Sequence, residues 1–106
     1  MSIDRNEAIQ RIRKALKARS GKSWSVTGGS GTAWGWIQIQ APPSRRAEPY
    51  GYTSEADRSE LGQLLGLEGP VHTQCVSIPA SNDYRQEYVD RAEGRSPAVT
   101  GKPYWD

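Results

Sequence analysis

Two tryptophans and a group of basic residues are the side chains whose types and spacing suggest ligand binding. Trp34 and Trp36 lie two residues apart in the run 33–40, AWGWIQIQ, which alternates as a β-strand does. This alternation predicts that both indoles share the face opposite Ile37 and Ile39, and we expect that face to be exposed. Aromatic rings on an open sheet face can stack on unpaired nucleic-acid bases, while nearby Lys and Arg pair with phosphates.

Polar and basic side chains complete this predicted interface. Gln38 and Gln40 share the strand face with the indoles and are suited to contacting base edges. The full set of predicted nucleic-acid contacts is Trp34, Trp36, Lys22, Arg13, Lys14, Lys17, Arg45, Arg46, Gln38 and Gln40. The alternative is that the indoles are covered by the aromatic segment 104–105, or by Tyr84 and Tyr88, and form a second small core.

The sequence contains no arrangement that is typical of catalysis. Residues 20–23, SGKS, resemble the end of a phosphate-binding loop, but Leu16 stands where that motif needs its first glycine. His72 and Cys75 are three residues apart in a predicted strand, so their side chains point to opposite faces and cannot form a nucleophile–base pair. We therefore predict a chain without enzymatic activity.

Composition narrows the class of protein further. A single Cys and a single His cannot supply the four ligands of a structural zinc, so we expect neither a metal nor another cofactor. A chain of 106 residues, 35% of them hydrophobic, is predicted to form one domain over 1–106. It has no long apolar run and no apolar signal segment near its start, so we expect a cytoplasmic protein without a membrane partner.

The net charge of +2 conceals a division along the chain. Residues 1–47 carry nine Lys and Arg against two acids, whereas residues 48–106 carry five against ten. Such asymmetry is typical of a basic surface that binds a polyanion, and equally of two halves that attract each other within the fold.

A helix over 4–19 is predicted to hold part of the basic set. Apolar residues recur there at helical spacing, a capping box begins the segment, and Gly21 provides the stop. The helical period turns Arg13, Lys14 and Lys17 away from the apolar stripe, toward solvent or a partner. Basic residues near the end of a helix also suit its dipole, which is an alternative, purely structural explanation.

A hairpin is predicted to hold the aromatic pair. Two alternating strands, 23–27 and 33–40, flank a glycine-rich turn. Trp24 and Val26 should share the inner face with the two isoleucines of the second strand. Gly35 between the indoles could introduce a bulge, which would turn one of them inward.

Further elements follow an exposed connector predicted over 41–53. They are a helix over 54–65, a strand over 71–78 and a helix between Ser81 and Gly94. In the last helix, Glu87 and Arg91 are spaced as a surface ion pair. The order helix, strand, strand, helix, strand, helix predicts an α+β domain, with a small, mostly antiparallel three-stranded sheet and helices on one face.

Two short segments resemble a known family. Residues 12–17, IRKALK, followed by residues 22–26, KSWSV, look like a helix-hairpin module found in large polyvalent proteins of phages and plasmids. The similarity covers roughly residues 10–40, and that module has Phe where this chain has Trp24. The resemblance implies a mobile-element context with DNA nearby, and it carries no catalytic residue.

The sequence therefore predicts a small binding domain that contacts single-stranded nucleic acid through the two indoles and the basic helix. A protein-interaction module is the alternative, an inhibitor or accessory subunit that presents the same aromatic face to a partner or to its own copy. Neither prediction specifies an oligomeric state.

Overall fold

The structure is a computed structural model of the 106-residue chain, and it describes residues 4–29, 35–42, 46–47, 52–67, 76–79, 82–95 and 104–105. The helices are α1 (Arg5–Ser20), α2 (Glu55–Leu64) and α3 (Asn82–Ala92). The strands are β1 (Ser25–Gly28), β2 (Trp36–Gln40), β3 (Arg46–Ala47), β4 (Tyr52–Thr53), β5 (Val76–Pro79) and β6 (Tyr104–Trp105). The predictions made for Trp34, Arg45, His72, Cys75 and Ser81 lie outside the described residues.

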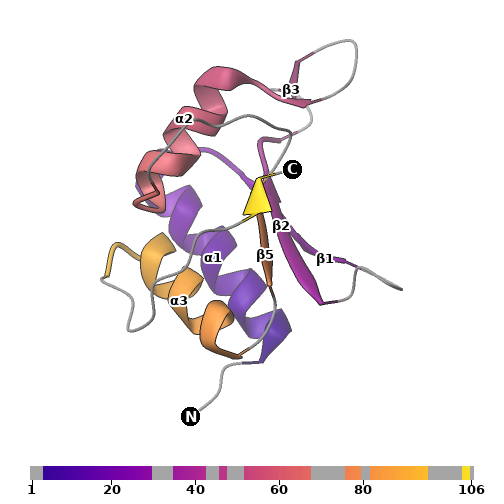
Figure 1. The fold of residues 1–106 in the computed structure, drawn as a ribbon. Coiled ribbons are helices and arrows are strands. Elements are labelled where there is room, and N and C mark those ends of the chain that lie inside the picture. The colour runs from indigo at the N-terminus through magenta and orange to yellow at the C-terminus, as the bar shows by residue number, and fades with distance from the viewer. Residues whose placement is uncertain are drawn as a thin grey trace.

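The fold has two layers, with the three helices on one side of an antiparallel sheet (Figure 1). The strands lie in the order β1-β2-β5-β6, and each neighbouring pair is antiparallel. The predicted α+β class, with its order of three helices and three main strands, is confirmed. The two-residue strand β6 extends the sheet beyond β5.

The segment predicted as an exposed connector contains more structure than its proline-rich sequence indicates. Ala41 is fully buried, and β3 pairs with β4 to form a small ladder separate from the main sheet. The burial of the Ala41 methyl group depends on what packs against the end of β2, so local sequence composition does not show it.

Helix α1 forms where the apolar spacing predicts it. Its buried stripe consists of Ala8, Ile9, Ile12 and Leu16. Gly21 ends it with a φ of 76°, and the Gly21 N–H donates to the Lys17 carbonyl, as expected for a C-terminal glycine. The predicted capping box does not form, because the N-cap residue Asp4 makes no side-chain capping hydrogen bond.

The inner face of the sheet forms the core with α1 and α3. Trp24, Val26, Ile37 and Ile39 are all buried, as the alternation predicts. Tyr88 of α3 belongs to this same core cluster. It therefore packs on the inner face of the sheet, and the alternative in which it covers the outer indoles is wrong.

Two of the helices bury a charged side chain, Asp57 in α2 and Glu87 in α3. Ser54 caps α2 as predicted, since its hydroxyl accepts a hydrogen bond from the Asp57 N–H. The expectation that Glu87 and Arg91 form an ordinary surface pair is wrong: Glu87 is 1% exposed, and its Oε2 lies 3.9 Å from Arg91 Nε. Because α3 packs against both α1 and β5, most of its circumference is enclosed.

Candidate nucleic-acid interface

Trp36 begins strand β2 on the outer face of the sheet. Its neighbours Ile37 and Ile39 are fully buried on the inner face, while Trp36 is 37% exposed, the most exposed large hydrophobic side chain among the described residues. The pairing of β2 with β1 and β5 runs without a bulge. Gly35 lies in the turn that precedes the strand, so it does not disturb the alternation.

Exposure on the outer face is greatest on the β1 side. Thr27 of β1 is exposed, and Gln38 of β2, which pairs with it, is partly exposed. Ser77 of β5 lies on the same face opposite Gln38 but is only 6% exposed. Among the side chains of this face that the structure describes, the accessible ones therefore form a strip over β1 and β2, which contains Trp36 and reaches the edge of the sheet.

Arg13 brings positive charge to that edge. Its Nη2 donates a hydrogen bond to the carbonyl of Val26 in β1, the edge strand. Val26 pairs with Ile39, three residues from Trp36, so the guanidinium contacts β1 about 10 Å along the strand direction from Trp36. The outer face of β2 therefore has an exposed aromatic side chain, and the neighbouring edge strand β1 has a cation on its backbone.

Arg5, which sequence reasoning did not select, also reaches β1. Its Nη1 donates to the Gly29 carbonyl at 3.2 Å, and its guanidinium carbon lies 2.6 Å from where a Cβ of residue 28 would stand. Glycine at position 28 therefore leaves the space that Arg5 occupies. Only the pairing of α1 with β1 creates this contact, so no local sequence signal could have identified it.

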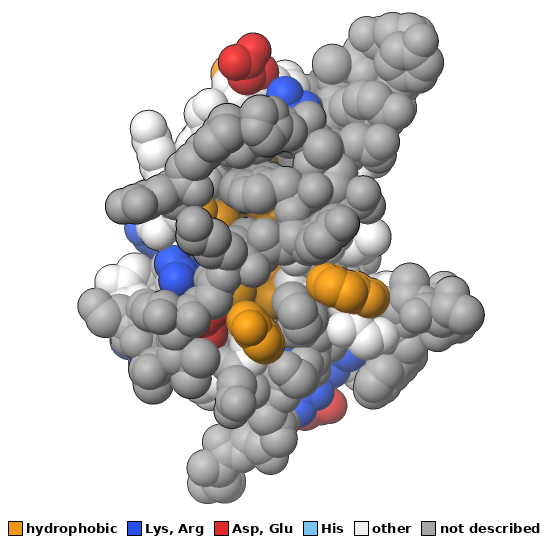
Figure 2. All heavy atoms as spheres, in the orientation of Figure 1, with side chains coloured by type: hydrophobic (Ala, Val, Ile, Leu, Met, Phe, Trp, Pro, Cys, Tyr) orange, Lys and Arg blue, Asp and Glu red, His pale blue; other side chains and the backbone are white. Residues whose placement is uncertain are grey.

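Lys14 and Lys17 are exposed on α1, as the helical period predicts. Within the part of the chain that the structure describes, neither side chain makes a hydrogen bond or an ion pair. Lysines with unpaired charges at a helix surface are available to phosphates. Figure 2 shows the described Lys and Arg side chains of the face drawn as small separate groups, without a continuous basic patch.

Lys22 is placed differently from the other predicted basic contacts. Its Nζ forms ion pairs with Asp57, at 3.2 Å, and with Glu60, both in α2. The hydrogen bond with Glu60 raises the pKa of the Lys22 ammonium, and the same group lies 5.9 Å from the centre of the Trp24 ring. A phosphate would have to compete with two carboxylates there, which the sequence could not reveal because they lie 35 and 38 residues away.

The remaining predicted contacts are described only in part. Gln38 and Gln40 are partly exposed on the outer face of β2. Arg46 lies in β3, away from the main sheet ladder, and only its backbone is described. The structure thus brings Trp36, Gln38 and Arg13 to the β1 side of the sheet, and it directs Lys22 toward α2.

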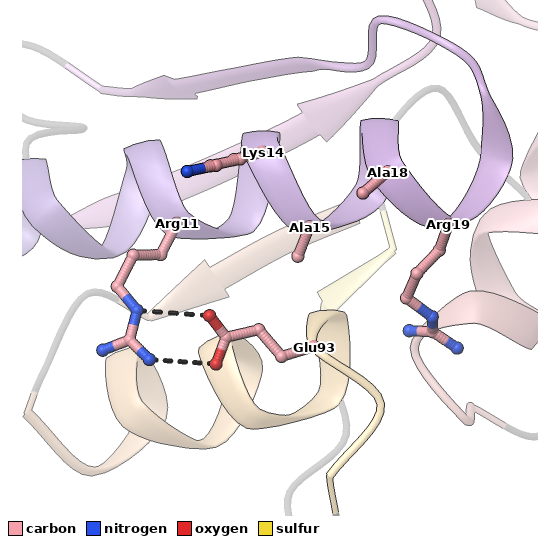
Figure 3. Close-up of a pocket in the computed structure, with 6 residues that line it drawn as sticks. All are labelled: Arg11, Lys14, Ala15, Ala18, Arg19 and Glu93. Carbon is pink, nitrogen blue, oxygen red and sulfur yellow. Dashed lines mark hydrogen bonds and ion pairs between the residues drawn. The ribbon is translucent and has the colours of Figure 1, made fainter.

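A hollow between α1 and α3 contains basic residues that sequence reasoning missed. It has a volume of about 440 Å³ and is lined by Arg11, Lys14, Ala15, Ala18, Arg19 and Glu93 (Figure 3). The spacing of Arg11, Lys14 and Ala18 on one helix could have indicated a shared surface. Glu93, which lines the opposite side of the hollow, lies just beyond the C-terminal end of α3. The spacing of residues on α1 therefore could not predict its presence there.

No family model, curated protein or solved structure matches this chain. The described residues contain no group of three or more potential metal ligands. None of the helices they form has the length and apolar character needed to cross a bilayer.

Proposed function

We propose that this chain is a small cytoplasmic binding domain that contacts single-stranded nucleic acid along the β1 edge of its sheet. The observation that carries the proposal is the exposed Trp36 on the outer face of β2, beside the edge strand β1 to which Arg13 contributes its guanidinium. A single strand needs both kinds of group, since bases stack on aromatic rings and phosphates pair with cations.

The geometry suggests a path for the strand. A base stacks on Trp36, Gln38 and Thr27 lie beside it for polar contacts, and the backbone passes the β1 edge toward Arg13 and Lys17. Unpaired bases suit this arrangement, because splayed bases can stack on an aromatic ring of an open sheet face. The resemblance to a phage and plasmid module is in line with a DNA-rich context.

Binding of a fluorescent oligothymidylate, followed by anisotropy, tests this proposal. Trp36→Ala removes the stacking surface and should weaken binding by about tenfold, since a stacked base contributes roughly 1 to 3 kcal/mol. Gln63→Ala is the matched control, because Gln63 is exposed on α2, away from the β1 edge. It should leave the affinity unchanged.

Salt separates nucleic-acid binding from protein association at the same face. The logarithm of the affinity should fall linearly with the logarithm of salt concentration, with a slope of about 0.7 for each phosphate contacted. Lys17→Gln should reduce that slope by about one contact. No binding of the oligonucleotide at low salt would refute the proposal and favour a protein partner for the aromatic face.

A further inference from the structure

The hollow between α1 and α3 has a surplus of cationic groups. Three of its lining side chains are basic, Arg11, Lys14 and Arg19, and Glu93 is the one acid among the lining residues. Glu93 is already paired with Arg11, at 2.9 Å, and with Arg95, at 2.5 Å. Its charge is therefore compensated before any ligand enters.

The basic side chains of the hollow retain unused donors. Glu93 accepts from Nε and Nη2 of Arg11, which leaves Nη1 available. Arg19 uses only Nη1, which donates to the carbonyls of Leu64, Arg91 and Ala92, so its Nε and Nη2 are available. With the Lys14 ammonium, three side chains offer N–H groups that have no acceptor within the described part of the chain.

The shape of the hollow keeps these donors apart from one another. Figure 3 shows Arg11 and Lys14 at one end of the hollow, Arg19 at the other, and Ala15 and Ala18 between them. Arg11 and Arg19 are eight residues apart on α1, which corresponds to about 12 Å along the helix axis. The two alanines have small side chains, so the surface between the cationic ends stays low and open.

We propose that this hollow binds a phosphorylated ligand, whose phosphate group lies at the Arg11 and Lys14 end while Arg19 contacts the ligand at the other end. Phosphate suits the site because its several oxygens can accept hydrogen bonds from donors on different side chains at once. Glu93 acts as a positioning residue, since its two hydrogen bonds to Arg11 hold the guanidinium in place. The site lies on the α3 side of α1 and does not depend on Trp36.

Chemical-shift changes in ¹H–¹⁵N NMR spectra, measured at constant ionic strength, test this site. Inorganic phosphate should produce saturable shifts in α1 and at Glu93, and Lys14→Gln should weaken binding by about tenfold. Gln10→Glu is the matched control, because it lowers the charge of the same helix by the same amount at an exposed position outside the hollow. Equal weakening by both variants, or no saturable shift, would overturn the proposal.

A second variant tests the hollow without removing any native contact. Ala18→Glu places a carboxylate between the cationic ends of the hollow, where it should abolish phosphate binding. Ala18→Gln is an uncharged control of similar size. Both side chains are good helix formers at an exposed position, so we expect the fold to persist. Phosphate binding that survives Ala18→Glu would count against the site.

Two further titrations identify the source of the phosphate. If thymidine 5′-monophosphate binds and oligothymidylate does not displace it, the ligand is a small phosphorylated molecule. Competition by oligothymidylate would indicate that the site holds a backbone phosphate of nucleic acid. Trp36→Ala should leave phosphate binding in the hollow unchanged, so failure of the sheet-edge proposal and failure of this one are distinguishable.

Discussion

Tyr88 places a phenol in the centre of the core. Its ring is fully buried beside Glu87 and Arg91, and the Arg91 guanidinium lies 5.4 Å from the ring centre. Burial raises the pKa of the Tyr88 hydroxyl well above its usual value, an effect that the Arg91 charge opposes and the Glu87 charge reinforces. The folded protein thus holds the phenol neutral at a pH where an unfolded chain would ionise it.

This pKa shift makes stability depend on alkaline pH. Below pH about 10 the phenol is neutral in both states, and above it only the unfolded state loses the proton, so the free energy of unfolding should fall with rising pH. Because Tyr88 ionises only in the unfolded state there, it contributes up to about 1.4 kcal/mol per pH unit to the fall in the free energy of unfolding. Urea denaturation of wild type and Tyr88→Phe at several values between about pH 9 and pH 12 measures the difference.

The Tyr88→Phe variant should lose stability more slowly as pH rises. Some alkaline loss remains in both proteins, because Lys22 also has a raised pKa and its pairing with Glu60 and Asp57 disappears when the ammonium deprotonates. Parallel pH profiles for the two proteins would show that the buried phenol is not the source of the alkaline loss.

At the scale of elements, one arginine joins the ends of three helices. Arg19 lies in the last turn of α1, and its Nη1 lies 2.9 Å from the Leu64 carbonyl at the end of α2. The same nitrogen is 3.1 Å and 2.8 Å from the carbonyls of Arg91 and Ala92 at the end of α3. Its positive charge compensates carbonyl groups that have no partner within their own helices.

Replacing Arg19 should therefore loosen the corner where the helices meet. Arg19→Met keeps helix propensity and side-chain length but removes these hydrogen bonds, and should lower the free energy of unfolding by about 1 to 2 kcal/mol. Lys17→Met is the control, because Lys17 contacts no carbonyl in the described residues, and its effect should stay within about 0.5 kcal/mol. Equal urea midpoints for the two variants would contradict this role of Arg19.

At the scale of the whole molecule, the two oppositely charged halves of the chain are joined by ion pairs. Arg11 pairs with Glu93, and Lys22 pairs with Asp57 and Glu60. Lys14 and Lys17 take no part in these ion pairs and lie on the exposed surface of α1. The charge asymmetry of the sequence thus provides attraction between the halves, which is one of the two roles that it allowed.

The C-terminal segment closes one side of the sheet. Strand β6 pairs with β5, with Val76 opposite Trp105 and Ser77 opposite Tyr104, so β5 is not an edge strand. Removal of residues 96–106 should expose the β5 edge, lower the free energy of unfolding and promote self-association. Sedimentation velocity at increasing protein concentration measures the association, and deletion of Asp106 alone is the control. A truncated chain that associates no more than the full chain and is equally stable would show that β6 is dispensable.

The sequence by itself determined the elements whose signals are local. Apolar spacing and Gly21 delimit α1, Ser54 begins α2, and strand alternation separates buried Ile37 from exposed Trp36. These features follow from helix and strand periodicity and from capping groups within a few residues, so they can be predicted without knowing what packs against them.

Only the tertiary structure decided which charged groups meet. The pairing of Lys22 with α2, the burial of Glu87, the reach of Arg13 to β1 and the hollow beside Glu93 each join segments far apart in the chain or depend on the packing of a helix. Local periodicity gives the direction of a side chain from its own element, whereas its partner and burial depend on how the elements are arranged in space.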